Sequence, residues 1–444
     1  MLLTALLLIT AIHAVRPMVS YRAIELGATS YQLGLVAGSY ALLSLVVAVP
    51  IGRWVDRRGE VRFLVSGAVV VAIVAALLAA ITSIAGLVVA QALLGVGQIL
   101  SVVALQSLVA SSGGPAARDA RFGVFSVTVS AGLIAGPALG GLIGGRSGAD
   151  LAQVFWMSCG FGLAGTAAAA SLWRWPPRMG GSEPMRGSEP RRGGSPRQRQ
   201  DRPAAGGAPM SRSGTAAVPT ALRLSRLPGM LQAMLASLTV LASIDIVVAY
   251  LPAYGELHGI SVGTVGLLLA TQSATSMTAR VLIVRLLRLL GRRRLLAFSM
   301  IITAASLAVL PLAGAHTRLL YLLMGCAGIG LGLAQPITMS WVVGRAPRGQ
   351  QATALGVRLT ANRGQLVLPA AAGVVAGVAG VPAIFVALSA LLATSGTVVI
   401  RTPLGDDQVP GPAKPVHRVF RAQTREVTRP KGSEDVRSRA KRGD

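Results

Sequence analysis

Charge is scarce in this 444-residue sequence, and negative charge is the scarcest part of it. Only 13% of the residues are charged, and 42 Lys and Arg against 16 Asp and Glu give a formal net charge of +26. A soluble domain carries about 25% charged residues. Together with 52% hydrophobic residues and a mean hydropathy of +0.62, this composition excludes an ordinary soluble protein and favours one that has lipid as its solvent.

The excess of positive charge does not indicate nucleic-acid binding. The arginines stand in short polar segments between apolar runs and in two longer polar segments, so they form no continuous basic face. Basic loops beside membrane helices report topology and attraction to anionic lipid headgroups. We therefore expect membrane lipids, and no nucleic acid, among the partners.

Cysteine and lysine are almost absent. The two cysteines, Cys159 and Cys326, lie in separate apolar runs, which argues against a disulfide framework. The three lysines, Lys414, Lys431 and Lys441, all lie near the C-terminus, so no phosphate-binding loop is present, and neither a nucleophile elbow nor a zinc-type His/Cys spacing occurs. We therefore expect a protein that is not an enzyme and that binds neither a metal nor a cofactor. We expect its energy source to be an ion gradient, of protons.

Long apolar runs are what the sequence does have. A helix needs about 20 apolar residues to cross a bilayer, and twelve runs reach or approach that length. The expected helices are 1–20, 31–51, 63–82, 84–108, 121–145, 152–173, 229–253, 261–286, 294–314, 318–343, 351–378 and 381–400. The first run starts at Met1 with no basic residue before it, which favours a membrane helix over a cleaved signal peptide and is compatible with a start upstream of Met1.

Two polar segments divide the chain. Residues 174–227 are rich in Gly, Pro, Ser and Arg, and the tail 401–444 has a similar composition. Such segments cannot bury apolar surface, so we predict a disordered linker and a disordered tail. The predicted domains are a bundle at 1–173 and a second bundle at 228–400.

The loops differ sharply in arginine content. The loops at one expected face hold about 13 arginines, and those at the opposite face hold about three, Arg22, Arg146 and Arg318. Positive loops stay in the cytoplasm. The sequence therefore predicts a multi-pass protein of the cell (inner) membrane with both termini and the linker in the cytoplasm.

The two halves resemble each other at a nearly constant offset. A shift of 232 residues aligns Gly34 with Gly266, Gly59 with Gly291 and Arg62 with Arg294, and a shift of 233 aligns Gly123 with Gly356. Several pairs at one offset favour duplication over chance in a glycine-rich chain. We expect an all-α membrane protein of 12 transmembrane helices in two pseudo-symmetric six-helix bundles.

A charged segment separates the second and third apolar runs. It has the spacing Gly-x-x-x-Asp-Arg-x-Gly-x-x-Arg, with Gly52, Asp56, Arg57, Gly59 and Arg62 at the named positions. This spacing resembles the signature loop between helices 2 and 3 of the major facilitator superfamily (MFS) of transporters, in which two parallel six-helix halves form the fold.

The resemblance implies that Asp56 belongs to a charge latch that holds the two halves together in the outward-open state. Arg358, in the eleventh run, is the candidate partner. The second copy of the loop has Arg288 where an acid would fall, so only one such latch is expected. The alternative is that the loop sets topology by its positive charge alone.

The fifth run contains a second motif, formed by Gly132, Gly136, Pro137, Gly140 and Gly141. Glycines at helical spacing give a flat face for close helix packing, and proline bends the helix. The pattern resembles the antiporter motif of MFS exporters, in particular drug/proton antiporters, and this resemblance implies export. The alternative is a helix packed through generic glycine contacts.

The fourth run carries Gln91 where drug/proton antiporters of the family usually have an arginine. Because glutamine has no charge, either another group handles protons or the coupling differs. The alternative is a polar residue that is hydrogen-bonded to a neighbouring helix.

Ionisable residues inside membrane spans are functional candidates because they are costly to bury. Asp245 is the one acid well inside an apolar run, and the repeat offset places it opposite His13. A carboxylate and a histidine can both exchange protons, so the pair could line the pathway. A structural pair with another polar group is the alternative for each residue.

Three arginines also fall within expected spans: Arg16, Arg280 and Arg363. Arginine stays protonated, so each needs an anion, a carbonyl or water. Binding of a substrate carboxylate, or a pair with Asp245, is the functional interpretation. Snorkelling to the interface is the alternative, strongest for Arg280 and weakest for Arg363.

The sequence thus predicts a monomeric secondary transporter that moves a small organic solute by rocking of two halves, with proton-coupled export as the favoured direction. Uptake of an anionic metabolite is one alternative, and a membrane scaffold or sensor that does not transport is the other. The identity of the solute does not follow from the sequence.

Overall fold

A computed structural model describes residues 1–111, 118–145, 151–173, 229–345, 362 and 368–401, and this part of the chain is entirely helical. The first half contains α1 (Leu2–Glu25), α2 (Ser30–Arg58), α3 (Glu60–Ala80), α4 (Ile84–Ser111), α5 (Arg118–Ile143) and α6 (Leu151–Ala170), followed by the 3-10 turn η2 (Ser171–Trp173). The second half contains α8 (Met230–Leu257), α9 (Val262–Val309), the 3-10 turn η3 (Leu310–Ala313), α10 (Thr317–Arg345), α12 (Leu368–Ala379) and α13 (Val381–Arg401). The expected linker 174–227, and the tail beyond residue 401, lie outside these ranges.

The helices meet the requirements for a membrane protein. Nine helices within the described ranges are long and apolar enough to cross a bilayer, and one of them, the stretch Val262–Ala313, has 52 residues. At 1.5 Å per residue that stretch would be about 78 Å long if straight, more than twice the roughly 30 Å thickness of the hydrocarbon core. It therefore has the length of two spans, as the two expected helices 261–286 and 294–314 require.

Single glycines make the two turns that the sequence pattern predicted as charged loops. Gly59 separates α2 from α3 with φ of 90°, and Gly291 interrupts α9 with φ of 72°. Both values suit glycine and strain other residues. The expected loop over 52–62 is accordingly wrong in extent, since α2 runs to Arg58 and α3 begins at Glu60. One residue with positive φ is enough to reverse the chain.

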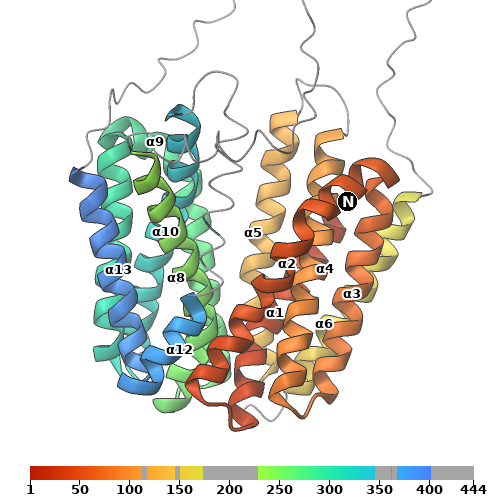
Figure 1. Cartoon of the computed structure of the whole chain (residues 1–444), viewed down its shortest axis with the longest axis horizontal. Helices are drawn as coiled ribbons and strands as arrows, with labels where there is room; N and C mark the ends of the chain where they lie inside the picture. Colours follow the sequence, from red (N-terminus) through yellow and green to blue (C-terminus); the bar gives the residue numbers. More distant parts are fainter. Residues whose placement is uncertain (112–117, 146–150, 174–228, 346–361, 363–367, 402–444) are drawn as a thin grey trace, which may run out of the picture.

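The helices form two groups that stand side by side (Figure 1). Helices α1 to α6 pack with one another, and α8, α9, α10, α12 and α13 form the second group. Among the described helices, four pairs join the groups: α5 with α9, α2 with α12, α1 with α8 and α2 with α8. Below, the far end is the end of the molecule at which α1 finishes and α2 begins, at the bottom of Figure 1.

Glycine contacts join α5 to α9 toward the far end. A Cβ atom added to Gly141 would lie 2.8 Å from the Cα of Gly266 and 3.0 Å from the carbonyl oxygen of Val262, and one added to Gly266 would collide with the carbonyl oxygen of Pro137. Side chains are thus excluded by backbone on both sides. The two helices approach as closely as their backbones permit.

A second contact of the same kind joins α2 to α12. A Cβ on Gly373 would lie 2.8 Å from the carbonyl oxygen of Ser30, and one on Gly34 would collide with the carbonyl oxygen of Pro369. The 232-residue offset converts the first contact into the second, because it relates Gly34 to Gly266 and Gly141 to Gly373. The same offset relates Ser30 to Val262 and Pro137 to Pro369, so the two contacts are pseudo-symmetric equivalents.

Tyr250 of α8 reinforces the second contact. Its hydroxyl lies 3.1 Å from the carbonyl oxygen of Ser30 and 3.2 Å from that of Pro369, and its side chain is fully buried. One hydroxyl therefore bridges a carbonyl of the first half and a carbonyl of the second. Both sets of contacts lie on the far-end side of the cavity described next.

Candidate functional site

A cavity of about 690 Å³, counting its open mouth, lies between the two halves. Helices α1 and α5 supply one wall, and α8, α9 and α10 supply the other. The lining residues are His13, Arg16, Ser130, Leu133, Pro137, Ile244, Val248, Leu269, Gln272, Ser273, Ser276, Met277, Arg280 and Leu331. A cavity whose surface is mostly apolar, with polar side chains at defined positions on its wall, is typical of a small-molecule site.

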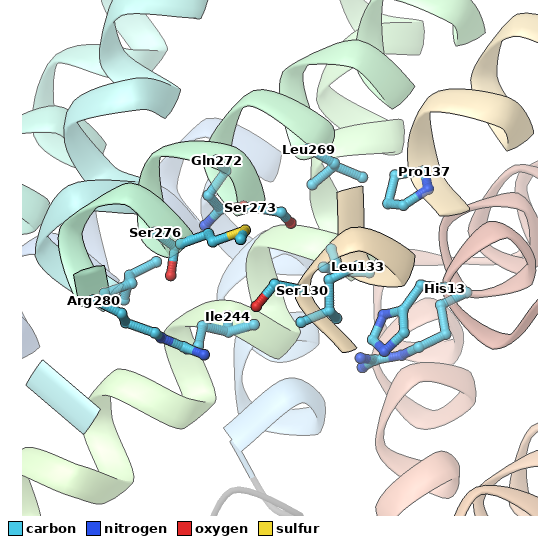
Figure 2. A pocket seen from close by; sticks show the side chains of 14 residues that line it. His13, Ser130, Leu133, Pro137, Ile244, Leu269, Gln272, Ser273, Ser276 and Arg280 are labelled. Atoms are coloured by element: carbon cyan, nitrogen blue, oxygen red, sulfur yellow. The ribbon is translucent and has the colours of Figure 1, made fainter. Parts of the chain in front are cut away.

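The wall formed by α9 carries a polar stripe. Gln272, Ser276 and Arg280 follow one another at intervals of four residues, which puts them on one face of the helix. Figure 2 shows them, with Ser273, on the side of the cavity opposite His13. Among the described residues, neither Nε2 of Gln272 nor Nε of Arg280 has a hydrogen-bond partner, although both atoms are buried.

The wall formed by α1 carries an ion pair that joins the halves. Arg16 donates to Asp245 of α8 at 2.7 Å, and the two side chains are 11% and 24% exposed. The guanidinium carbon of Arg16 lies 4.4 Å from the centre of the Tyr40 ring, in the arrangement of a cation–π contact. The Tyr40 hydroxyl in turn donates to the side-chain oxygen of Gln98. Four helices, α4, α2, α1 and α8, are connected in this way.

In α1, the residue that contacts Asp245 is not the one that the repeat pattern predicts. The residue of α1 that contacts Asp245 is Arg16, whereas His13, one turn earlier, lies on the cavity wall. The pairing of Arg16 with Asp245 was one of the two functional interpretations for the arginines. The predicted juxtaposition of His13 and Asp245 came from the sequence offset, which carries no information about the rotation of each helix about its axis.

The structure also places two other polar residues of the predicted spans. Arg280, for which snorkelling was the strongest alternative, lines the cavity, and its Nε is buried. Gln91 is 4% exposed, its side-chain oxygen has no partner within the described ranges, and it is not a lining residue. The glutamine that joins the charged network is Gln98, two turns further along α4.

The glycine–proline motif of α5 contacts two neighbouring helices, α1 and α9. Gly132, Gly136 and Gly140 face α1, where added Cβ atoms would lie 2.8–3.0 Å from the Ile9 side chain or from the backbone of Thr10 and Ala14. Gly141 faces α9 as described, and Pro137 lines the cavity. The motif thus packs α5 against α1 of its own half and against α9 of the second half, beside the cavity.

Most of the predicted latch cannot be placed. Arg358 and Arg363 lie outside the described residues, as do the side chains of Asp56 and Arg57 and the surroundings of Gly52. Arg62 is exposed, and its carbonyl oxygen accepts a hydrogen bond from Ser66 at 2.9 Å.

Sequence reasoning missed several residues of the site, namely Tyr40, Gln98, Ser130, Gln272, Ser273 and Ser276. For the α9 stripe a signal existed, because the run Thr271-Gln-Ser-Ala-Thr-Ser is polar within an otherwise apolar span and Arg280 continues its four-residue spacing. No comparable signal distinguishes Tyr40 or Gln98 from other single polar residues in their helices.

Comparison with known proteins agrees with this architecture. The family model of the Major Facilitator Superfamily matches residues 1–262 and, separately, residues 233–432. An uncharacterized MFS-type transporter of Methanocaldococcus jannaschii is 24% identical over 147 residues, an alignment that covers 33% of this chain and 37% of that relative. The chain thus aligns with well under two thirds of that relative.

Solved transporters have the same fold. A variant of the nucleoside transporter NupG superposes with a TM-score of 0.70 at 13% identity, covering 90% of this chain and 98% of the other. A bacterial homologue of the human lysosomal transporter Spinster gives 0.69 at 15% identity, with coverage of 92% and 98%. A D-xylose–proton symporter gives 0.66 at 13% identity, with coverage of 91% and 97%.

At these identities the structures establish the fold alone, and the family match establishes membership. The described helices, the offset that relates the halves and the interfacial cavity are consistent with both. This chain is a multi-pass membrane protein with the fold of a transporter, and it belongs to the Major Facilitator Superfamily.

Proposed function

We propose that the chain is a secondary active transporter that moves a small organic solute by alternating access, and that it exports this solute in exchange for protons that flow inward. The observation that carries the proposal is a cavity between two pseudo-symmetric halves, with an ion pair that connects those halves in its wall. A site at the interface of repeats is where such transporters bind their cargo.

The described conformation supports an assignment of sides. Glycine contacts and Tyr250 hold the halves together at the far end. The Spinster homologue, which superposes well on this chain, was solved in an inward-facing and occupied conformation. We propose that the far end is the outer face and that the structure is inward-facing. On this orientation and the arginine distribution, we also propose that the protein lies in the inner membrane of the cell with both termini in the cytoplasm.

The ion pair provides a means of proton coupling. Arginine remains charged at any physiological pH, so within this pair only Asp245 can change its charge. Among the described residues, the titratable or charged groups that interact with Asp245 are Arg16 and Tyr40. Protonation of Asp245 would remove the charge that holds Arg16 and release one connection between the halves. Proton binding and rocking are thereby linked.

The α5 motif supports export, because its five positions match the antiporter motif and one of its residues, Gly141, packs against α9 of the second half. Uptake of an anionic metabolite is the second candidate function, and the positions of Arg16 and Arg280 on the cavity wall favour it. The latch of Asp56 and Arg358 remains a prediction.

The test is a pair of flux measurements on reconstituted vesicles. A solute that raises the melting temperature of the purified protein is used in two assays, exchange across the membrane without a gradient and accumulation driven by a pH gradient. Asp245→Asn is expected to retain exchange and to lose the response to the pH gradient, because no proton can then be carried by that side chain.

Glu256→Gln is the matched control, since it is the same chemical change on an exposed residue near the end of α8. It should retain both activities. An unchanged response to the pH gradient in Asp245→Asn would rule out this residue as the coupling group, and absence of exchange in the unmodified protein for every stabilising solute would contradict transport itself.

A further inference from the structure

The charges of the cavity wall do not balance. Among its described lining residues are two arginines and one histidine, and none is acidic. Arg16 is neutralised by Asp245 outside the lining set. Arg280 has no ion-pair partner within the described ranges, and its Nε is buried without a hydrogen bond. Within the described part of the wall, one guanidinium therefore lines the cavity without a compensating charge, in a protein whose solvent is lipid.

An uncompensated cation in a membrane-spanning helix is costly unless an anion or water reaches it. Arginine presents donors in a planar fork that matches a carboxylate. Only one such group is free on the described part of the wall, and this suits a single negative charge better than the multiple charges of a phosphate ester.

The other residues of the cavity wall indicate the chemical character of the rest of the solute. Leu133, Ile244 and Leu269 face the same cavity, so most of the body of the solute meets hydrocarbon. Gln272 adds one specific polar contact, because its Nε2 is buried without a partner among the described residues. Gln272 and Arg280 are eight residues apart, about 12 Å along the helix axis, so they would contact opposite ends of an elongated solute.

We propose, building on the transport function above, that the cavity binds an amphipathic organic monocarboxylate. Arg280 pairs with the carboxylate, Ser276 lies beside it on the same stripe, and Gln272 donates to a hydrogen-bond acceptor at the other end of the solute. Arg16 keeps its role in the ion pair with Asp245. The polar stripe belongs to the second half and His13 to the first, so the solute touches both halves, as alternating access requires.

The experiment compares acids with their uncharged amides. The melting temperature of the purified full-length protein is measured with 4-methoxybenzoate, 5-methoxyindole-3-acetate and 8-hydroxyoctanoate, each of which carries an acceptor away from its carboxylate, and with the corresponding amides at the same concentrations. At least one acid is expected to stabilise the protein, and its amide is expected to do so at least about tenfold more weakly, as loss of a charged hydrogen bond implies.

Two variants test the assigned residue. Arg280→Gln should lose the preference for acids, and Arg280→Lys, which keeps the charge but lacks the planar fork, should retain part of it. Arg285→Gln is the control, because Arg285 is exposed on the same helix and does not line the cavity. The melting temperature without ligand shows whether each variant is folded. If Arg280→Gln is not folded, Arg280→Lys tests the role of Arg280.

Equal responses to acids and amides, including no response to any of them, would overturn the proposal, as would an Arg280→Gln variant that still prefers acids. Exchange assays separate this outcome from failure of the transport function. Acid binding without transport contradicts the function alone, whereas transport of a neutral solute without preference for acids contradicts the monocarboxylate alone.

Discussion

The ion pair of Arg16 and Asp245 is a direct contact between charged groups of the two halves. It is partly buried, and the Tyr40 ring covers the guanidinium at 4.4 Å. In such a setting, removal of one partner leaves the other charge without compensation, which typically costs about 3–5 kcal/mol, whereas removal of both is far less costly. The pair therefore contributes more to selecting one arrangement of the halves than to net stability.

We expect Arg16→Gln and Asp245→Asn each to lower the melting temperature of the detergent-solubilised protein more than the double variant does. The physical reason is the uncompensated charge that each single variant leaves. A thermal unfolding series on the four proteins, read as a double-mutant cycle, measures the coupling. If the two single effects simply add in the double variant, the charges do not interact as the structure indicates.

At the scale of helices, close backbone approach at glycine positions determines how the halves meet. Gly141 and Gly266 join α5 to α9, and Gly34 and Gly373 join α2 to α12 in the equivalent manner. Because backbone atoms lie on both sides of each contact, a side chain at these positions cannot be accommodated by a change of rotamer.

Gly141→Leu should separate the halves at the far end, because its side chain would collide with the backbone of α9. Spin labels at Ala28 and His258, near the far ends of the two halves, would report a longer distance by pulsed electron resonance. Gly123→Leu on the same helix is the matched control, since a Cβ there meets nothing within 4 Å. An unchanged distance distribution in Gly141→Leu would show that this contact does not hold the far end closed.

Two tyrosines of α8 allow a finer test of the same closure. Tyr250 bonds to carbonyl groups of both halves, whereas Tyr254 bonds to Leu310 and Gly314 within the second half. Tyr250→Phe should therefore increase the population with an open far end, and Tyr254→Phe should not, although each variant loses about 1 kcal/mol of hydrogen bonding. The same spin-label pair measures both, and equal behaviour of the two variants would contradict a role of Tyr250 between the halves.

For the molecule as a whole, the proposed mechanism involves one equilibrium, between two arrangements of the halves. Both the contacts at the far end and the groups at the cavity would act on it. The far-end contacts hold the halves together on one side, and the ion pair connects them at the cavity. A solute in the cavity would contact His13 of the first half and the α9 stripe of the second. In the proposed mechanism, proton binding, solute binding and conformation are coupled, because each acts on contacts between the same two groups of helices.

The helices and the repetition of the two halves could be predicted from the sequence alone. Apolar runs of span length predicted the helices, the 232-residue offset predicted that the halves repeat, and the positions of Gly59 and Gly291 marked where the chain turns. These features are local, since they depend on hydrophobicity and on the backbone freedom of glycine. The α5 motif also predicts close helix packing, but it does not predict which helices are the partners.

Which polar groups meet depends on how the helices pack and could not be predicted from the sequence. Arg16 rather than His13 contacts Asp245, Gln98 rather than Gln91 joins the charged network, and Arg280 faces the cavity. In a soluble helix a polar face reveals the rotation about the axis, but these helices are apolar nearly all round, since both lipid and neighbouring helices favour apolar side chains. Rotation and pairing are then set by packing between residues distant in sequence, such as the glycines that fix α5 against α1 and α9.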